Sequence, residues 1–378
     1  MNHPLPKWVD YGLIPLLNLV TAFLVAGLVV LIVGENPFEA AYLLVRGAFG
    51  YGGGIGYTLF YATNFIFTGL SVAVAIHCGL FNIGSEGQAY VGGIGVAAAC
   101  LALDHYVPWF VTLPFAIAGA AIAGAAWALI PAWLQAKRGS HVVITTIMFN
   151  FIASALMIYL LVEVLKPAGS MSPETRTFVE GGRIPKLDWL FELFGSSLGG
   201  APFNWTFFLA LLCCYLVWLL IWRTRLGYEI RTTGTNPTAA VYAGIPQVRT
   251  IVIAMLISGA LAGMMAINPV MGDQARLQES FPAGAGFVGI AVSLMGRNHP
   301  VGIIFAAILF GMLWQGGAEL AFDMPNISRD MIVVIQGLVI LFAGALEHMY
   351  RPALSAIFFM RQSSGAPASA GQANTGEA

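Results

Sequence analysis

Charge is scarce in this chain, and its scarcity excludes whole classes of protein. Of the 378 residues only 9% are charged, 58% are hydrophobic, and the formal net charge is -1. A soluble domain of this length needs many more charged side chains to cover its surface. A balance so close to neutral also leaves no basic stripe for a nucleic acid polymer. The composition therefore predicts an integral membrane protein.

Lysine and cysteine are rare as well. The four lysines follow Pro6, Ala136, Leu165 and Pro185, so none stands in the Gly-Lys-Ser/Thr sequence with which a P-loop binds ATP. The four cysteines form no CxxC pair and have no histidine at metal-ligand spacing, which predicts that they are packing residues. No HExxH motif, GxSxG motif or acidic cluster with metal spacing occurs. We therefore expect no catalytic residues, no metal and no cofactor in this chain.

Long uncharged apolar windows are what the chain has in abundance. A helix that crosses a bilayer needs about 17–25 such residues, and the windows predict an all-α integral membrane fold with about ten transmembrane helices. The candidates are residues 11–33, 57–77, 87–103, 109–134, 142–164, 203–222, 250–271, 283–296, 300–319 and 331–346.

The first window is a retained span and no signal peptide. Tyr11–Gly34 runs uncharged for 24 residues, which is longer than the apolar core of about 7–15 residues in a signal peptide, and no small-residue cleavage site follows. We predict one polytopic transmembrane domain over residues 1–351. Residues 352–378 form a cytoplasmic tail that is disordered from about residue 362, because its Ser, Gly, Ala, Pro, Asn and Gln bury no core.

The basic residues of the short loops predict the orientation. Placing the amino terminus inside puts most of them on the cytoplasmic side, as the positive-inside rule requires, and both termini are then cytoplasmic. The long polar segment 165–202 falls outside. The inside residues are Lys7, Lys137, Arg138, Arg223, Arg225, Arg231, Arg249, Arg297, Arg351 and Arg361, against Arg46, Arg276 and Arg329 in the short outside loops.

One carboxylate stands alone in the apolar sequence. Between Arg46 and Asp104 the only charged residue is Glu86, within the sequence NIGSEGQ at residues 82–88. An acid at the centre of a membrane helix costs about 2.5–3.5 kcal/mol on insertion scales unless its surroundings satisfy it. The glycines predict a broken helix that presents polar groups to a cavity.

Polar and aromatic side chains around this break are the candidates for a solute pathway. Amide groups offer donors and acceptors to a nucleobase or to sugar hydroxyls, and aromatic rings can stack on a base. The almost uncharged spans favour an uncharged polar or aromatic solute. The candidates are Phe65, Phe81, Asn82, Glu86 and Gln88. The alternative for Glu86 is structural, namely that it satisfies backbone amides at a helix start and holds the third span in place.

A second segment predicts a short surface helix. Thr235 or Asn236 can cap a helix that begins at Pro237, and Gly244 can end it. Pro246 prevents its continuation into the next span. Such a helix, at about residues 236–244, is suited to docking a cytoplasmic partner, although an ordinary structured loop has the same pattern.

A third segment, residues 285–302, carries small residues that permit close helix packing. It ends in the sequence GRNHP at residues 296–300, which predicts a tight cytoplasmic turn.

Together these segments resemble permease subunits of ABC importers in the branched-chain amino acid and simple-sugar permease superfamily, and most closely the nucleoside branch. GLFNIGSEGQ at residues 79–88 is similar to the NIGxEGQ signature of that branch. Residues 226–245 resemble the family's GxxxRxxGxNPxAAxxAGI loop, and residues 286–300 its GFxGIAVALLGRxxP stretch, with Val288 in place of the usual acidic or polar residue.

The resemblance implies an import machine of several chains. It implies an ABC ATPase subunit that binds ATP and Mg, a second permease that is a different but related chain, an extracytoplasmic solute-binding protein, and a location in the lipid of a bacterial cytoplasmic (inner) membrane. Nucleosides are the first substrate expected, with simple sugars next. The surface helix would then be the coupling element that enters a groove on the ATPase. The residues assigned to coupling are Gly227, Arg231, Gly234, Asn236, Pro237, Ala240 and Gly244.

Two other functions are compatible with the residues alone. One is an ion-coupled secondary transporter in which Glu86 carries the proton. The other is a membrane-embedded enzyme or scaffold.

Overall fold

The structure is a computed structural model in which the chain divides into two compact units. The first unit comprises residues 1–37 and 333–378, and the second comprises residues 38–332. The residues that the structure describes are 9, 13–193, 195, 197–328, 331–338 and 341. The predicted tail after residue 352 lies outside them. The first unit contains α1 (Ile14–Ile32), which matches the first expected span, and its residues 333–338 are also helical. The other elements belong to the second unit.

Seven described helices are long and apolar enough to cross a membrane, or eight if the bent pair at residues 20–32 and 37–49 counts as one span. No strand occurs in the described part of the chain, so the all-α membrane fold is confirmed. The seven are α3 (Gly52–His77), α4 (Ser85–Leu103), α5 (Trp109–Arg138), α6 (Val142–Leu160, continued to Leu165), α8 (Thr206–Arg223), α11 (Gln247–Met264, continued by α12, Ile267–Gly272) and α14 (Pro300–Asp323).

The count of ten spans is not confirmed. The expected span at residues 283–296 is only the 11-residue helix α13 (Ala285–Met295), which is too short to cross a bilayer by itself. The expected last span at 331–346 extends beyond the described residues. A helix that no apolar window predicted, α2 (Pro37–Phe49), follows α1.

Glycine lets three of the long helices touch backbone to backbone. A Cβ added to Gly92 of α4 would lie 2.4 Å from the Cα of Gly263 in α11, and one added to Gly95 of α4 would lie 2.3 Å from the carbonyl oxygen of Gly119 in α5. Side chains at these positions would force the helices apart, as in other close helix contacts within membranes. Helices α4, α5 and α11 therefore form a tightly packed group, and α3 packs against α11, α13 and α14.

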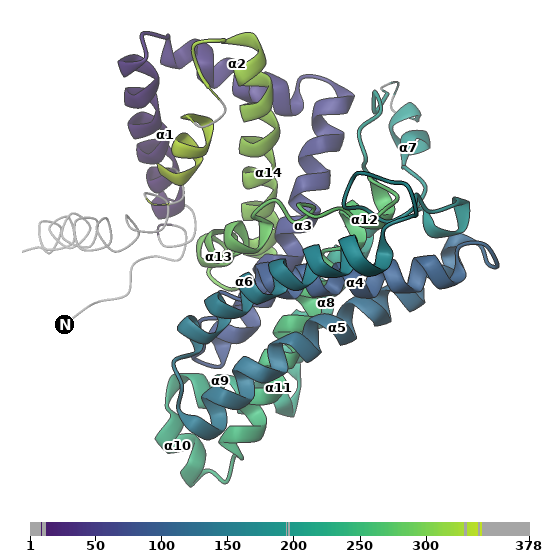
Figure 1. Cartoon of the computed structure of the whole chain (residues 1–378). Coiled ribbons are helices and arrows are strands. Elements are labelled where there is room, and N and C mark those ends of the chain that lie inside the picture. Colours follow the sequence, from purple (N-terminus) through teal and green to yellow (C-terminus); the bar gives the residue numbers. More distant parts are fainter. Residues whose placement is uncertain are drawn as a thin grey trace, which may run out of the picture. The chain divides into compact units, whose positions relative to one another are not determined.

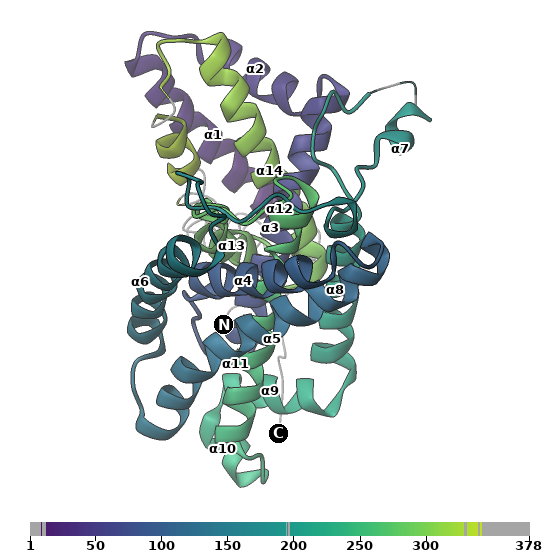
Figure 2. The ribbon, with the colours of Figure 1, turned by 45° about the vertical axis from the view of Figure 1, so that its right-hand side comes forward.

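The second unit has two structurally distinct ends (Figures 1 and 2). At one end, called here the α10 end, α9 (Arg225–Thr235) and α10 (Pro237–Tyr242) join α8 to α11. At the other end lies the strap, the largely irregular segment 166–205 that joins α6 to α8 and contains the short helix α7 (Asp188–Glu192). All four cysteines are buried.

Candidate functional site

Glu86 lies in the first turn of α4, directly after the non-helical interruption that the glycines of this segment predicted. Residues 80–84 are non-helical and the helix resumes at Ser85, so the break ends slightly earlier than the expected 82–88. The Glu86 carboxylate accepts hydrogen bonds from the backbone N–H groups of Gly284 (3.0 Å) and Gly286 (2.7 Å), at the start of α13. Its side chain is buried, with 6% of the residue exposed. Glu86 thus satisfies amides at a helix start, but those of a helix about 200 residues away in the sequence.

The start of α13 is well suited to a carboxylate. The first N–H groups of a helix have no partner inside it and carry a partial positive charge. Close approach is possible because residue 286 is glycine: a Cβ there would lie 2.3 Å from the backbone nitrogen of Glu86. The interaction links the start of α4 to the start of α13 without a basic side chain.

Asn82 and Gln88 are brought together, and they bind each other. The Nδ2 of Asn82 donates to the Oε1 of Gln88 (3.0 Å) and to the Oγ of Ser258 in α11 (2.8 Å). Both amides are almost fully buried. The network continues from Ser258 to Ser71 of α3 (3.0 Å). These groups fasten the break to two neighbouring helices, while Phe81 is half-buried beside them.

Asn150 of α6 binds the backbone on both sides of the break, and the sequence analysis did not predict it. Its Oδ1 accepts from the N–H of Gly87 (2.8 Å), and its Nδ2 donates to the carbonyl of Ile83 (2.9 Å). A lone amide in an otherwise apolar span was the available signal, because a polar side chain in a membrane helix usually has a specific partner.

Phe65 lies elsewhere, in the wall of a cavity of about 180 Å³. The cavity is bounded by α3, α12, the loop before α13, and α14. Its lining comprises Phe60, Tyr61, Asn64, Phe65, Pro269, Asp273, Gln274, Ser280, Phe281, Pro282, Ala283, Ala285 and Trp314. Of the predicted pathway residues, only Phe65 lines it. Glu86 is nevertheless linked to the cavity wall, because the lining residue Ala285 stands between Gly284 and Gly286, whose N–H groups donate to Glu86.

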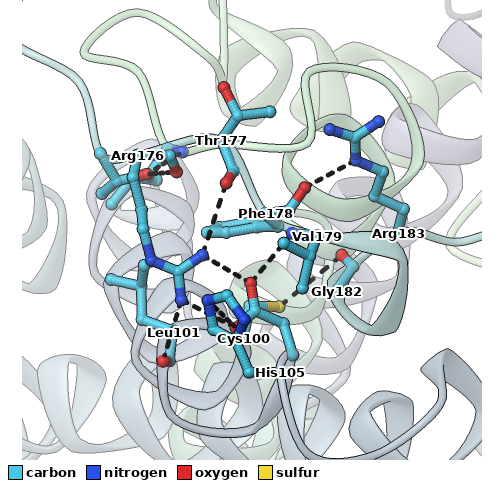
Figure 3. Close-up of polar contacts among 12 residues, drawn as sticks. Cys100, Leu101, His105, Arg176, Thr177, Phe178, Val179, Gly182 and Arg183 are labelled. Carbon is cyan, nitrogen blue, oxygen red and sulfur yellow. Dashed lines mark hydrogen bonds and ion pairs between the residues drawn. The ribbon is translucent and has the colours of Figure 1, made fainter.

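The strap is fastened to the end of α4 by an ion pair between a buried carboxylate and a partly exposed arginine (Figure 3). The guanidinium of Arg176 contacts both carboxylate oxygens of Asp104, at 2.7 and 2.8 Å, and the N–H of Val179 donates to the same carboxylate at 3.1 Å. The Asp104 side chain is fully buried. Burial alone would raise the pKa of Asp104, but the hydrogen bonds from Arg176 and Val179, together with the charge of Arg176, hold the pKa below its usual value.

A second, more exposed contact joins the strap to the loop that precedes α13. The Nη1 of Arg276 lies 2.9 Å from the Oε1 of Glu174, and the N–H of Thr175 donates to the carbonyl of Leu277 (3.1 Å). The strap therefore contacts both α4 and the loop that forms one rim of the cavity.

At the α10 end, the predicted surface helix is present. Asn236 is its cap, since its Oδ1 accepts from the N–H of Ala239 (3.0 Å), and Gly244 follows with φ +76°. Ala240 faces inward, whereas Tyr242 is 89% exposed. The helix is thus a capped projection with an exposed apolar tip.

Two glycines bring α9 against its neighbours. A Cβ on Gly227 would lie 2.0 Å from the carbonyl oxygen of Leu220, and one on Gly234 would lie 2.3 Å from the carbonyl oxygen of His77, at the end of α3. Arg231, which was also assigned to coupling, lies between them in α9 and is half-buried. Helix α9 therefore lies directly against the backbone at the end of α3.

Long apolar helices, a helix break held by buried polar contacts, and a capped projecting helix define this chain as a polytopic membrane transport protein. Among the described residues, no three His, Cys, Asp or Glu side chains are grouped so as to hold a metal ion. A family model described as the permease component of the branched-chain amino acid transport system matches residues 54–344. The chain belongs to this family.

Individual relatives match over nearly the whole chain. The glucose ABC transporter permease protein TsgB13 of Haloferax volcanii is 32% identical, over 98% of this chain and 96% of its own length. The guanosine permease NupP of Bacillus subtilis is 33% identical, over 90% and 94%. The nucleoside permease NupB of Lactococcus lactis is 33% identical, over 87% and 90%.

The resemblance to ABC permeases is therefore confirmed. The chain is the membrane-embedded permease subunit of an ABC importer and not an enzyme, and ATP hydrolysis belongs to a separate subunit. Permeases of this family have no cofactor of their own, and they work with an ATPase and a paired permease.

Proposed function

We propose that this permease moves a nucleoside into the cytoplasm, with a simple sugar as the second candidate. The observation that carries the proposal is the cavity, whose wall holds five aromatic side chains and two amides. Stacking on aromatic rings together with amide hydrogen bonds suits a flat, uncharged, polar solute. The similarity to permeases named for guanosine and for nucleosides supports the same substrate class.

The remaining parts of the machine follow from this assignment. The partner ATPase binds ATP and Mg, the second permease is a related but different chain, and an extracytoplasmic binding protein delivers the solute. The strap end faces outward in this proposal, and the α10 end faces the cytoplasm of a bacterial cell with an inner membrane, as do both termini. The lipid surrounds the exposed apolar faces of the long helices.

Glycine contacts and caps at the α10 end support a coupling role for α9 and α10. ATP-driven closure of the ATPase pair would displace α10, and α9 would transmit the displacement to α3, whose other half lines the cavity. The contributing residues are Gly227, Arg231, Gly234, Asn236, Pro237, Ala240 and Gly244.

The break at residues 80–84 and the first turn of α4 have a supporting role in the pathway. Phe65 contacts the solute, whereas Asn82, Gln88 and Glu86 hold α3, α4, α11 and α13 in register around it. Phe81 lies beside the break, where rearrangement of these helices would expose or cover it. Alternating access then requires the α4–α13 contact to move as a unit.

Uptake by the complete importer tests the proposal. The permease would be reconstituted with its ATPase, paired permease and binding protein into vesicles that are loaded with ATP. We expect ATP-dependent uptake of radiolabelled guanosine or uridine. Uptake of glucose alone would replace the nucleoside by a sugar, and uptake driven by a proton gradient without ATP would contradict the importer.

A variant of Asn236 tests the coupling step. Asn236→Ala removes the α10 cap, at a cost of about 1 kcal/mol to that helix. We expect transport and binding-protein-stimulated ATP hydrolysis to fall together while membrane insertion is unchanged. Asn236→Asp keeps a capping oxygen and is the matched control. Full uptake by both variants would remove the coupling role of this cap.

A further inference from the structure

The cavity has a strongly aromatic wall. Tyr61 lies 6.1 Å and Phe65 lies 5.8 Å, centroid to centroid, from Trp314, and Phe60 contacts Tyr61 at 5.5 Å. On the loop side, Phe281 is held by an edge contact with Tyr90 (5.9 Å). Aromatic rings gathered on opposite sides of a cavity offer faces and edges to a planar ligand.

Its size matches one planar ring system. The volume is about 180 Å³, and an apolar cavity of about 150 Å³ is known to accept a benzene molecule. A purine or pyrimidine base is of this order, whereas a base with its ribose is larger. A nucleoside would therefore place its base inside and leave its sugar toward the opening.

Two amides in the lining have unused hydrogen-bonding capacity. The Oδ1 of Asn64 accepts from the Nδ2 of Asn268 (2.8 Å), but the Nδ2 of Asn64 has no acceptor among the described residues, although the residue is only 7% exposed. The Oε1 of Gln274 is buried and has no donor within the described part of the chain. A free donor and a free acceptor complement the C=O and N–H groups that lie side by side on a nucleobase edge.

The opening of the cavity carries the carboxylate of Asp273, and Lys186 of the strap lies close enough to interact with it electrostatically. Asp273, Ser280 and Ala283 are its exposed lining residues. A carboxylate such as Asp273 accepts hydrogen bonds from sugar hydroxyls. The opening therefore offers a hydrogen-bond acceptor to the hydroxyls of a ribose.

We propose that this cavity is a nucleobase site, in which the base lies among Phe65, Trp314 and Phe281, bonds to Asn64 and Gln274, and leaves its ribose at Asp273. The proposal rests on nucleoside import as the function, and it adds the place and the manner of recognition. It also separates base-bearing solutes from sugars, because a hexose lacks both the flat ring and the amide edge.

Photolabelling of the assembled importer tests the site. The probe is 8-azidoguanosine, or 5-azidouridine where the uptake panel selects a pyrimidine, and the modified peptides are located by mass spectrometry. We expect labels within residues 52–77, 273–285 and 300–323. Excess unlabelled nucleoside should suppress them, whereas glucose should not. Labels elsewhere, or labels that the nucleoside does not suppress, would overturn the site.

Substitutions provide the matched comparison. Base-on-aromatic stacking contributes enough that Trp314→Leu should reduce specific labelling about tenfold. Trp314→Phe should retain most of it, and Gln274→Leu should weaken it. Trp133→Leu, at a tryptophan that is 45% exposed and lies in α5 outside the cavity lining, is the control. Equal labelling of the Trp314→Leu and Trp133→Leu proteins would overturn the site.

The experiments distinguish failure of nucleoside import from failure of the cavity as the nucleobase site. If the wild-type importer takes up glucose and no nucleoside, the proposed substrate is wrong. If it takes up nucleosides normally while the labels lie outside the three segments, nucleoside import stands and this cavity is not the site.

Discussion

Two buried carboxylates, Glu86 and Asp104, are stabilised by different kinds of partner. Glu86 lies in the first turn of α4 and is bound only by backbone N–H groups of another helix. Asp104 lies just beyond the last turn of the same helix, and Arg176 donates hydrogen bonds to both of its carboxylate oxygens. One contact consists of helix amides and the other of an ion pair. Of these two carboxylates, the one just past the end of α4 has a charged partner, and the one in the first turn of α4 is held by backbone N–H groups alone.

The largest effect should come from removing the Glu86 carboxylate. Glu86→Ala leaves two buried N–H groups without an acceptor, and each such group costs about 1–3 kcal/mol. We expect a marked fall in the melting temperature of the solubilised protein and loss of uptake. Glu86→Gln retains one acceptor oxygen, so its melting temperature should lie between those of the wild type and Glu86→Ala. Glu163→Gln, at an exposed acid, is the control; if it and Glu86→Ala melt alike, the Glu86 contact contributes nothing.

Arg176→Ala should have the next largest effect. It leaves the buried Asp104 carboxylate with the Val179 N–H and the more distant His105 ring, whose Nε2 is 3.9 Å from Oδ1. We expect a loss of about 2–3 kcal/mol, below the 3–5 typical of a broken buried pair, because Arg176 is partly exposed and His105 is near. Arg176→Lys keeps the charge and loses the two-point geometry, so it should be intermediate. Thermal unfolding measures all three proteins. An unchanged melting temperature for Arg176→Ala would show that solvent replaces the arginine.

Acid should weaken the Asp104 contact more gently. The folded pKa of Asp104 is depressed, so its ionised form contributes stability that is complete above the unfolded value of about 3.9 and is lost as the pH falls through the folded value. Neutral and mildly acidic solutions should therefore leave the contact intact. Melting curves of wild type and Asp104→Asn between pH 7 and pH 3 should converge only at the acid end. Convergence already near pH 6 would contradict this assignment.

The smallest effect should come from Glu174→Gln. The Glu174–Arg276 pair is partly exposed on both sides, and such pairs contribute about 0.2–1 kcal/mol, less at high salt. We expect a small loss of stability that disappears as the ionic strength is raised. A loss as large as that of Arg176→Ala would show that the rim of the cavity depends on this pair.

The features that could be predicted from the sequence are those encoded by neighbouring residues. Long apolar runs specify the main helices, and the order Asn236, Pro237, Gly244 specifies α10 because caps act within one turn. The helix break was visible for the same reason, since the glycines stand inside it. The span predicted around α13 was too long because its window counted loop residues before Ala285, whereas the polar turn GRNHP begins directly after Met295.

Partners distant in the sequence could not be predicted. Glu86 binds the N–H groups of residues 284 and 286, and backbone amides carry no sequence signal. Arg176 pairs with Asp104 across 72 positions, and the strap holds other basic residues that looked equally available. The cavity joins Phe65 to Gln274 and Trp314 only through the packing of α3 against α12 and α14. The sequence thus indicated the chemistry of the pathway without showing where its walls meet.

The burial of all four cysteines makes this permease convenient for site-directed probes. Thiol reagents react with accessible thiolates, and buried cysteines are inert. The wild-type chain can therefore serve as its own background for single cysteines introduced on exposed positions, such as Tyr242 at the tip of α10 or Met171 on the strap. A maleimide dye at either position would report when each end of the importer becomes covered by a partner during the transport cycle.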